Sequence, residues 1–158
     1  MSDALEVYQH MKEFVGFTDK DVKNLPRLIG VVEKHGGAIT DRFYDLLAKY
    51  PSTNSQIEGR VDALKATHGR WMKELVSGDY GEDYFNSRMK IGLAHVRIGL
   101  DPYYVEGVMT HLRTEGLLAI REDLGGEADV EDLQAAWLRI LDLDLLVINL
   151  AYGEERLE

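Results

Sequence analysis

The sequence predicts a single domain built of α-helices alone. Apolar residues recur at helical spacing along almost the whole chain, and runs with the period of two that is typical of strands are missing. The chain has 158 residues, 45% of them apolar, which is enough to bury one sizeable core and too few to need a second domain. The predicted fold class is therefore all-α.

The N-terminal third is expected to begin with a short helix at about 3–14. Thr18 followed by Asp21 then has the form of a helix start, because a threonine hydroxyl can cap the free N–H groups of a first turn. Pro26 suits the first turn of the next helix, which is expected to end at the glycine pair 36–37.

The middle of the chain is expected to hold three more helices. The first, at about 38–50, stops before Pro51, and the polar residues 51–58 form a connection with one helical turn. The other two lie at about 60–77 and 82–98 and are separated by a tight break. Each of these two carries an apolar stripe at helical spacing that includes one histidine.

The C-terminal part is expected to form two long helices. Asp101 and Pro102 supply an N-cap and a first-turn proline for a helix that reaches about Asp123, and a glycine turn leads to a final helix at 129–152. Apolar residues surround the axis of the final helix, so more than one of its sides must be buried. A homodimer through the last two helices would bury them. The alternative is that the final helix is the central helix of one monomer.

Composition excludes several classes of partner and site. Lys and Arg number 18 against 28 Asp and Glu, a net charge of −10, whereas a nucleic acid or an anionic membrane surface would require a basic face. Cysteine is absent, which excludes disulfides, thiolate metal sites and cysteine nucleophiles. With no apolar stretch near the roughly 20 residues of a membrane span, and no signal peptide, we expect a cytoplasmic location.

The common catalytic motifs are also missing. A ferritin-like di-iron site needs a glutamate three residues before a histidine, and none of the five histidines has one. The sequence contains no HExxH, no P-loop and no strand-borne GxGxxG, and no nucleophile elbow supports a Ser/His/Asp triad. The histidines themselves remain as the candidate functional residues.

His68 and His95 lie on the apolar stripes of the two successive helices at 60–77 and 82–98, at comparable distances from the break between them. They can therefore face one another across a slot. Two opposed imidazoles in a helical domain without cysteine suit a haem wedged between them. The alternative is that both are core histidines with satisfied hydrogen bonds.

Three segments resemble the haem domain of globin-coupled sensors and the related protoglobins. They are FYDLLAKYP at 43–51, LKATHGRWMKELVSGDY at 64–80 and IGLAHVRIGLDPYYVEG at 91–107. The resemblance runs over nearly the whole chain. It implies a globin-like helical sandwich with an extra N-terminal helix and a short or absent helix between the third helix and the distal helix at 60–77. It also implies that residues 1–158 form one sensor globin domain that binds haem b (iron protoporphyrin IX), the N-terminal input module of a longer chain.

The resemblance also implies roles for individual residues. The proximal iron ligand falls on His95. The distal tyrosine falls on Tyr44, beside Phe43, where a phenol can donate a hydrogen bond to a bound diatomic ligand. Leu64 and Thr67 match positions that line the ligand pocket, and Thr67 could supply a second hydroxyl.

The sequence departs from the usual family pattern at His68, where relatives more commonly carry an apolar residue. Its stripe neighbours Leu64 and Trp71 predict that His68 points inward. We therefore expect His68 to be the sixth iron ligand when no gas is bound, at least in the ferric state. The alternative is a neutral His68 that forms a hydrogen bond nearby.

Other residues are expected to line or border the pocket. Candidate walls, with core packing as the alternative, are Trp71, Met72, Ile91, Ile98, Leu141 and Leu145. Lys90 and Arg97 could meet haem propionates or lie on a solvated face. The remaining histidines, His10, His35 and His111, are given structural roles.

The predicted function is a haem-binding sensor rather than an enzyme. It would detect O2, CO, NO or redox state, and it would signal through a homodimer interface to a covalently linked output domain. One alternative is a haem redox enzyme, such as a nitric oxide dioxygenase or a peroxidase-like protein. The other is a helical interaction module without haem, in which His68 and His95 are core residues.

Overall fold

The computed structural model describes residues 3–157, and side chains over residues 3–154. Within this range the helices are α1 (Asp3–Phe14), α2 (Asp19–Asn24), the 3₁₀ helix η1 (Leu25–Leu28), α3 (Ile29–Ala48), α4 (Pro51–Ile57), α5 (Val61–Leu75), α6 (Glu82–Arg97), α7 (Pro102–Leu124) and α8 (Val130–Leu157). The described residues include no strand, so the all-helical prediction is confirmed. None of these helices is long and apolar enough to cross a membrane.

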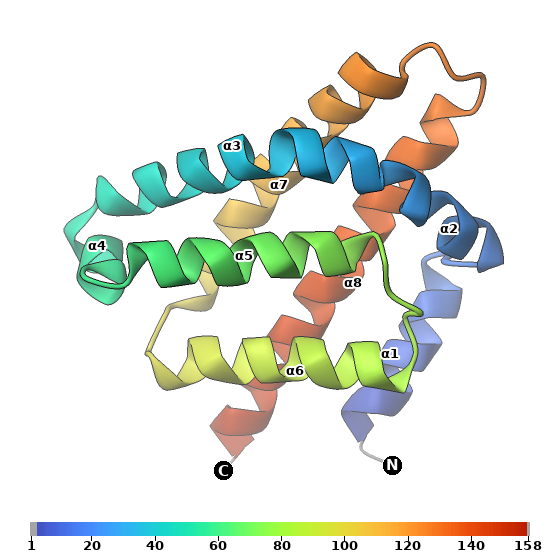
Figure 1. Ribbon diagram of the computed structural model, residues 1–158. Helices are drawn as coiled ribbons and strands as arrows, with labels where there is room; N and C mark the ends of the chain where they lie inside the picture. The colour runs from blue at the N-terminus through green and yellow to red at the C-terminus, as the bar shows by residue number, and fades with distance from the viewer. Residues whose placement is uncertain (1–2, 158) are drawn as a thin grey trace.

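The helices form two crossing layers. Helices α3, α5 and α6 run across the front of Figure 1, and α7 and α8 cross behind them. Helix α3 packs against α5 and α7, α6 packs against α8, and α7 packs against α8. The additional N-terminal helix α1 packs against α8 and α6. This arrangement is the helical sandwich that the resemblance implied.

The predicted helix start at Thr18 is confirmed. The Thr18 hydroxyl accepts a hydrogen bond from the Lys20 N–H, and the Asp21 carboxylate accepts one from the Thr18 N–H, so α2 begins with a capping box. Pro26, however, lies in the short 3₁₀ helix rather than at the start of a long helix.

The predicted helix end at glycines 36–37 is wrong, because α3 continues through both. The reason is that Gly36 is buried where α3 meets α5. A Cβ added to Gly36 would lie 3.3 Å from Met72 Sδ, so this glycine allows two helices to approach rather than ending one. The two helices expected on either side of the pair are one helix of 20 residues.

The polar connection at 51–58 is mostly the short helix α4, which begins at Pro51. The Thr53 hydroxyl donates to the Leu47 carbonyl oxygen at 2.5 Å and fixes the corner between α3 and α4. The short helix expected before the distal helix is therefore present, and α5 is that distal helix.

Helix α8 is the central helix of the molecule. It packs against α1, α2, η1, α6 and α7, and its fully buried side chains include Leu133, Ile140 and Val147. Gly92 lets α6 come close to it, since a Cβ there would lie 2.7 Å from the Ala151 Cβ. Contacts within one chain thus explain why the helix is apolar all round, and its composition alone does not require a dimer.

A completely buried ion pair joins α6 to α8. Arg88 and Asp144 are both 0% exposed, and the Arg88 Nε donates to an Asp144 oxygen at 2.8 Å. Asp144 also accepts hydrogen bonds from the Tyr84 hydroxyl and, at 3.0 Å, from the Trp71 indole N–H. Burial raises the pKa of Asp144, and these donors oppose that effect.

The other side of Arg88 binds α5. Its guanidinium donates to the Glu74 carboxylate at 2.6 Å and to the Trp71 carbonyl oxygen at 3.2 Å. It also lies over the Tyr84 ring, 4.2 Å from the centroid. One buried cation therefore connects α5, α6 and α8, which hydrophobic periodicity did not predict.

Replacing Arg88 is expected to destabilise the fold far more than replacing an exposed arginine between helices. Arg88→Met keeps most of the side-chain volume but leaves Asp144 buried without its cation, which should lower the free energy of unfolding by about 3–5 kcal/mol. Arg113→Met removes the more exposed pair with Asp142 that joins α7 to α8, and should cost less than about 1 kcal/mol. Urea unfolding of both variants measures the difference. Equal losses of unfolding free energy in the two variants would show that the buried pair contributes no more to stability than the pair Arg113–Asp142.

Candidate functional site

A cavity of about 330 Å³ lies between α5 and α6 and is bordered by α3, α4 and α7. Its volume falls within the range of about 300–1,000 Å³ that is usual for small-molecule and cofactor sites. Most of its lining side chains are apolar. The candidate residues from the sequence that line it are Phe43, Tyr44, Leu64, Thr67, His68, Trp71, Ile91, His95 and Ile98.

Three candidate pocket walls lie elsewhere. Met72 follows Trp71 on α5 and so faces a different direction, toward Gly36 of α3. Leu141 is fully buried in the core, and Leu145 packs against that core. Among the described side chains of α8, Ile148 is the one that lines the cavity, so the sequence placed this contact one to two turns too early.

The wall formed by α7 was missed. It consists of Tyr104, Val105, Val108, Met109 and Leu112. These residues recur at helical spacing, so their periodicity could have identified them. Lining residues from α4, such as Ile57, were missed because the segment was expected to be mainly a connection.

His95 lies in the last turn of α6 and has a defined tautomer. Its Nδ1 is 2.6 Å from the Ile91 carbonyl oxygen. Because a carbonyl can only accept, Nδ1 must carry the proton, and Nε2 of the neutral ring then keeps a lone pair. Burial lowers the pKa of His95, which favours this neutral form. Nε2 is therefore the ring nitrogen that can bind a metal.

His68 is packed among aromatic rings on α5. Its ring centroid lies 5.0 Å from that of Phe43 and 5.2 Å from that of Trp71, and the Tyr44 ring meets it edge-on. Its Nδ1 is 2.9 Å from the Thr40 hydroxyl of α3. Burial, together with the nearby His95, lowers the pKa of His68 from 6.5 to about 4. The ring is thus neutral at pH 7.

Tyr44 places a phenol at the cavity from α3. Burial raises its pKa to about 12, against the opposing effect of Arg60, so the hydroxyl keeps its proton. Among the described residues the Tyr44 hydroxyl has no hydrogen-bond partner, and it can donate to a ligand in the cavity. Thr67 differs, because its hydroxyl already donates to the Ala63 carbonyl oxygen at 3.1 Å.

Arg60 is the only lysine or arginine among the described residues that line the cavity. Its side chain donates to the Gln56 carbonyl oxygen and lies near enough to Tyr44 to influence that residue's pKa. Lys90 and Arg97, the cations that the sequence suggested, do not line the cavity. The cation at this site thus comes from the start of α5 rather than from α6.

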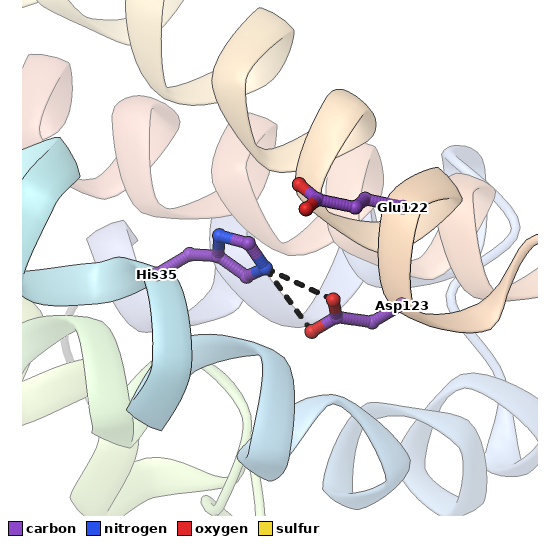
Figure 2. A group of neighbouring side chains, drawn as sticks. All are labelled: His35, Glu122 and Asp123. Carbon is purple, nitrogen blue, oxygen red and sulfur yellow. Dashed lines mark hydrogen bonds and ion pairs between the residues drawn. The ribbon is translucent and has the colours of Figure 1, made fainter.

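A second group of possible metal ligands lies between α3 and α7. Figure 2 shows His35 pointing at Asp123, with Glu122 beside them, and one ligand atom of each lies within 4.8 Å of the others. His35 Nε2 is 3.1 Å from both Asp123 oxygens, and the Lys34 ammonium is 3.2 Å from one of them. These pairs between α3 and α7 explain the arrangement without a metal ion.

Comparison with known proteins gives a consistent result. The family model of protoglobins matches residues 6–158. The heme-based aerotactic transducer HemAT of Halobacterium salinarum is 29% identical over 139 residues, a match that covers 82% of this chain. That match covers only 28% of the transducer's own length.

Two solved structures are similar over most of their length. The globin domain of the Geobacter sulfurreducens globin-coupled sensor superposes with a TM-score of 0.85 at 32% identity, covering 91% of this chain and 96% of that chain. The ferric globin domain of E. coli DosC gives a TM-score of 0.74 at 16% identity, covering 90% and 97%. At that identity the second likeness shows the fold alone.

Acidification is expected to destabilise the haem-free protein through His68. Its folded-state pKa of about 4 lies below the unfolded value of 6.5, so between these values the unfolded chain binds more protons. The contribution of His68 to the free energy of unfolding is complete above pH 6.5. It is lost as the pH falls toward 4, a change of about 3 kcal/mol.

Urea unfolding at pH 7, 6 and 5 measures this dependence. His68→Gln should make the profile less steep and leave the dependence due to His95, whereas His111→Gln, at an exposed position on α7, should leave it as in the wild type. A wild-type pH profile in His68→Gln would contradict the assignment.

Proposed function

The chain belongs to the protoglobin family, and from this membership we propose that it binds haem b between α5 and α6 and senses a diatomic gas or redox state. The observation that carries the proposal is the pair His68 and His95, which line one cavity from facing helices with both Nδ1 atoms engaged. Haem iron would supply gas binding and one-electron redox chemistry.

The lining of the cavity fits a haem in its chemistry. It is apolar over most of its surface, as a porphyrin requires, and the two neutral imidazoles offer the nitrogen donors that bind haem iron. Arg60, the cation among the described lining residues, is proposed to pair with a propionate. Cysteine, another axial donor to haem iron, is absent from the sequence.

His95 is proposed as the proximal ligand and His68 as the sixth ligand of the gas-free ferric protein. An internal ligand competes with an external one, so the apparent gas affinity falls by the fraction of molecules in which His68 is released. Such competition suits a sensor, because it gives the protein two states that bind gas differently.

Tyr44 is proposed as the hydrogen-bond donor to the bound gas. Its phenol keeps its proton and has no competing partner among the described residues. Thr67 is a weaker candidate, because its proton is already donated to the carbonyl oxygen of Ala63 in its own helix.

The signal is proposed to leave through α7 and α8. The His68 ring contacts Trp71, whose indole N–H donates to Asp144 of α8.

Leu118, 68% exposed on α7, offers an apolar contact for a second copy of the chain. Sedimentation with and without gas tests this homodimer. As in a transducer, a linked output region would receive the signal. We also predict a cytoplasmic location.

Haem binding is tested by adding ferric haem to the haem-free protein and recording visible spectra. The wild type should shift and sharpen the Soret band of free haem and give a six-coordinate low-spin ferric spectrum. His95→Ala should weaken binding severely, and His68→Ala should give a high-spin ferric spectrum. His10→Ala, at an exposed position on α1, is the control. A spectrum unchanged from that of free haem would refute the proposed function, and a low-spin His68→Ala protein would refute the role of His68 alone.

Loss of the Tyr44 hydroxyl should speed dioxygen release from the ferrous protein. One neutral hydrogen bond contributes about 0.5–1.5 kcal/mol, so Tyr44→Phe should raise the dissociation rate about two- to tenfold. Carbon monoxide release should change less, because that ligand carries little negative charge. Stopped-flow measurements give both rates, with Tyr50→Phe as the exposed control. Equal rates in Tyr44→Phe and the wild type would exclude this donor.

A further inference from the structure

We propose that Thr40 is a positioning residue for His68. Its hydroxyl is the hydrogen-bond partner of Nδ1 and so holds the imidazole in the direction that leaves Nε2 for iron. If Nε2 binds iron, Nδ1 of the neutral ring carries the proton and the hydroxyl accepts it. The inference rests on the proposed function, because it concerns the same histidine. It adds a residue that does not itself line the cavity.

The first observation is the unusual direction of the Thr40 hydroxyl. A threonine inside a helix usually donates to a carbonyl oxygen of the preceding turn. Thr67 does so with Ala63 at 3.1 Å, and Thr114 with Thr110 at 3.0 Å. Thr40 is 4% exposed in the middle of α3, and its hydroxyl instead meets His68 of α5 at 2.9 Å. Among the described residues it has no other hydrogen bond.

The second observation is that the two cavity histidines are held alike. In each ring Nδ1 faces an oxygen, the Ile91 carbonyl for His95 and the Thr40 hydroxyl for His68. The Ile91 carbonyl can only accept, so it fixes the tautomer of His95, whereas the Thr40 hydroxyl can donate or accept. In either case the partner of Nδ1 fixes the ring direction and leaves Nε2 as the nitrogen that can bind a metal.

The two partners also differ in where they lie. The Ile91 carbonyl belongs to the same helix as His95, whereas Thr40 belongs to α3 and His68 to α5. The direction of the His68 ring is therefore tied to the packing of α3 on α5. Tyr44 lies one turn after Thr40, so one face of α3 presents both the hydroxyl that holds His68 and the phenol proposed to bind gas.

The hydrogen bond can be measured without haem. Nitrogen-15 NMR of labelled, haem-free protein at pH 7 should give a His68 Nδ1 resonance typical of a hydrogen-bonded nitrogen in the wild type and in Thr40→Ser. Thr40→Val removes the partner and should move this resonance toward that of a nitrogen without a hydrogen bond, whereas Thr114→Val should not. A wild-type Nδ1 without a hydrogen bond, or a Thr40→Val resonance unchanged from the wild type, would overturn the proposal.

The consequence for ligation is measured in the ferric haem complex. The ratio of six-coordinate low-spin to five-coordinate protein should fall about tenfold in Thr40→Val, the low end of the usual cost of losing an outer-shell partner. Thr40→Ser should restore it, and Thr114→Val should match the wild type. If valine does not fit, Thr40→Ala tests the same loss.

The outcomes separate the two proposals. A His68→Ala protein that loses its low-spin spectrum, together with an unchanged Thr40→Val protein, would overturn only the role of Thr40. A His68→Ala protein that stays low-spin would refute ligation by His68, and with it the purpose assigned to Thr40. A spectrum unchanged from that of free haem in the wild type and every variant would refute haem binding itself, whatever the NMR result.

Discussion

The buried pair Arg88–Asp144 is the constraint on which the other contacts of the site depend. A buried ion pair is tolerated only when its remaining donors and acceptors are satisfied, and here Trp71, Tyr84 and Glu74 satisfy them. Trp71 is therefore held through its indole N–H, and its ring forms a wall of the cavity. The shape of the cavity is set in part by a polar network in the core beside it. The same network ties α5 and α6 to α8.

The charge state and hydrogen bonds of the cavity side chains would favour the proposed metal. Burial lowers the pKa of both histidines, so neither ring carries a positive charge at pH 7 that would oppose iron. Each Nδ1 is engaged outside the cavity, whereas Tyr44, with a raised pKa, keeps a proton to donate. Burial favours the uncharged form of each group. It lowers the pKa of the two imidazoles, which lose a proton and can bind a metal, and it raises the pKa of the phenol, which keeps its proton and can donate a hydrogen bond.

The sequence could predict features that depend on one helix and its breaks. The stripes through His68 and His95 required only helical spacing, and Thr18 required only a local cap. The prediction that His68 and His95 meet one cavity from two helices also holds, but other features that depend on two helices were not predicted. The contact of Gly36 with Met72 cannot be seen in one segment, so the glycine pair indicated a helix end. Leu141 was expected at the cavity, whereas the crossing of α8 decides which turn reaches it. The pair Arg88–Asp144 was not predicted, because nothing in the local sequence marks a buried ion pair.

A displacement of His68 cannot be absorbed by its own side chain. The ring lies against Phe43 and Trp71 and is bonded to Thr40, so moving it disturbs either α3 or the tryptophan. Turning Trp71 would break its hydrogen bond to Asp144, whose full burial makes an unsatisfied oxygen costly. Packed helices also shift more readily as rigid bodies than they deform. The lower-energy response would therefore be a movement of α5 with the network, and such a movement would carry the change proposed at the cavity to α8.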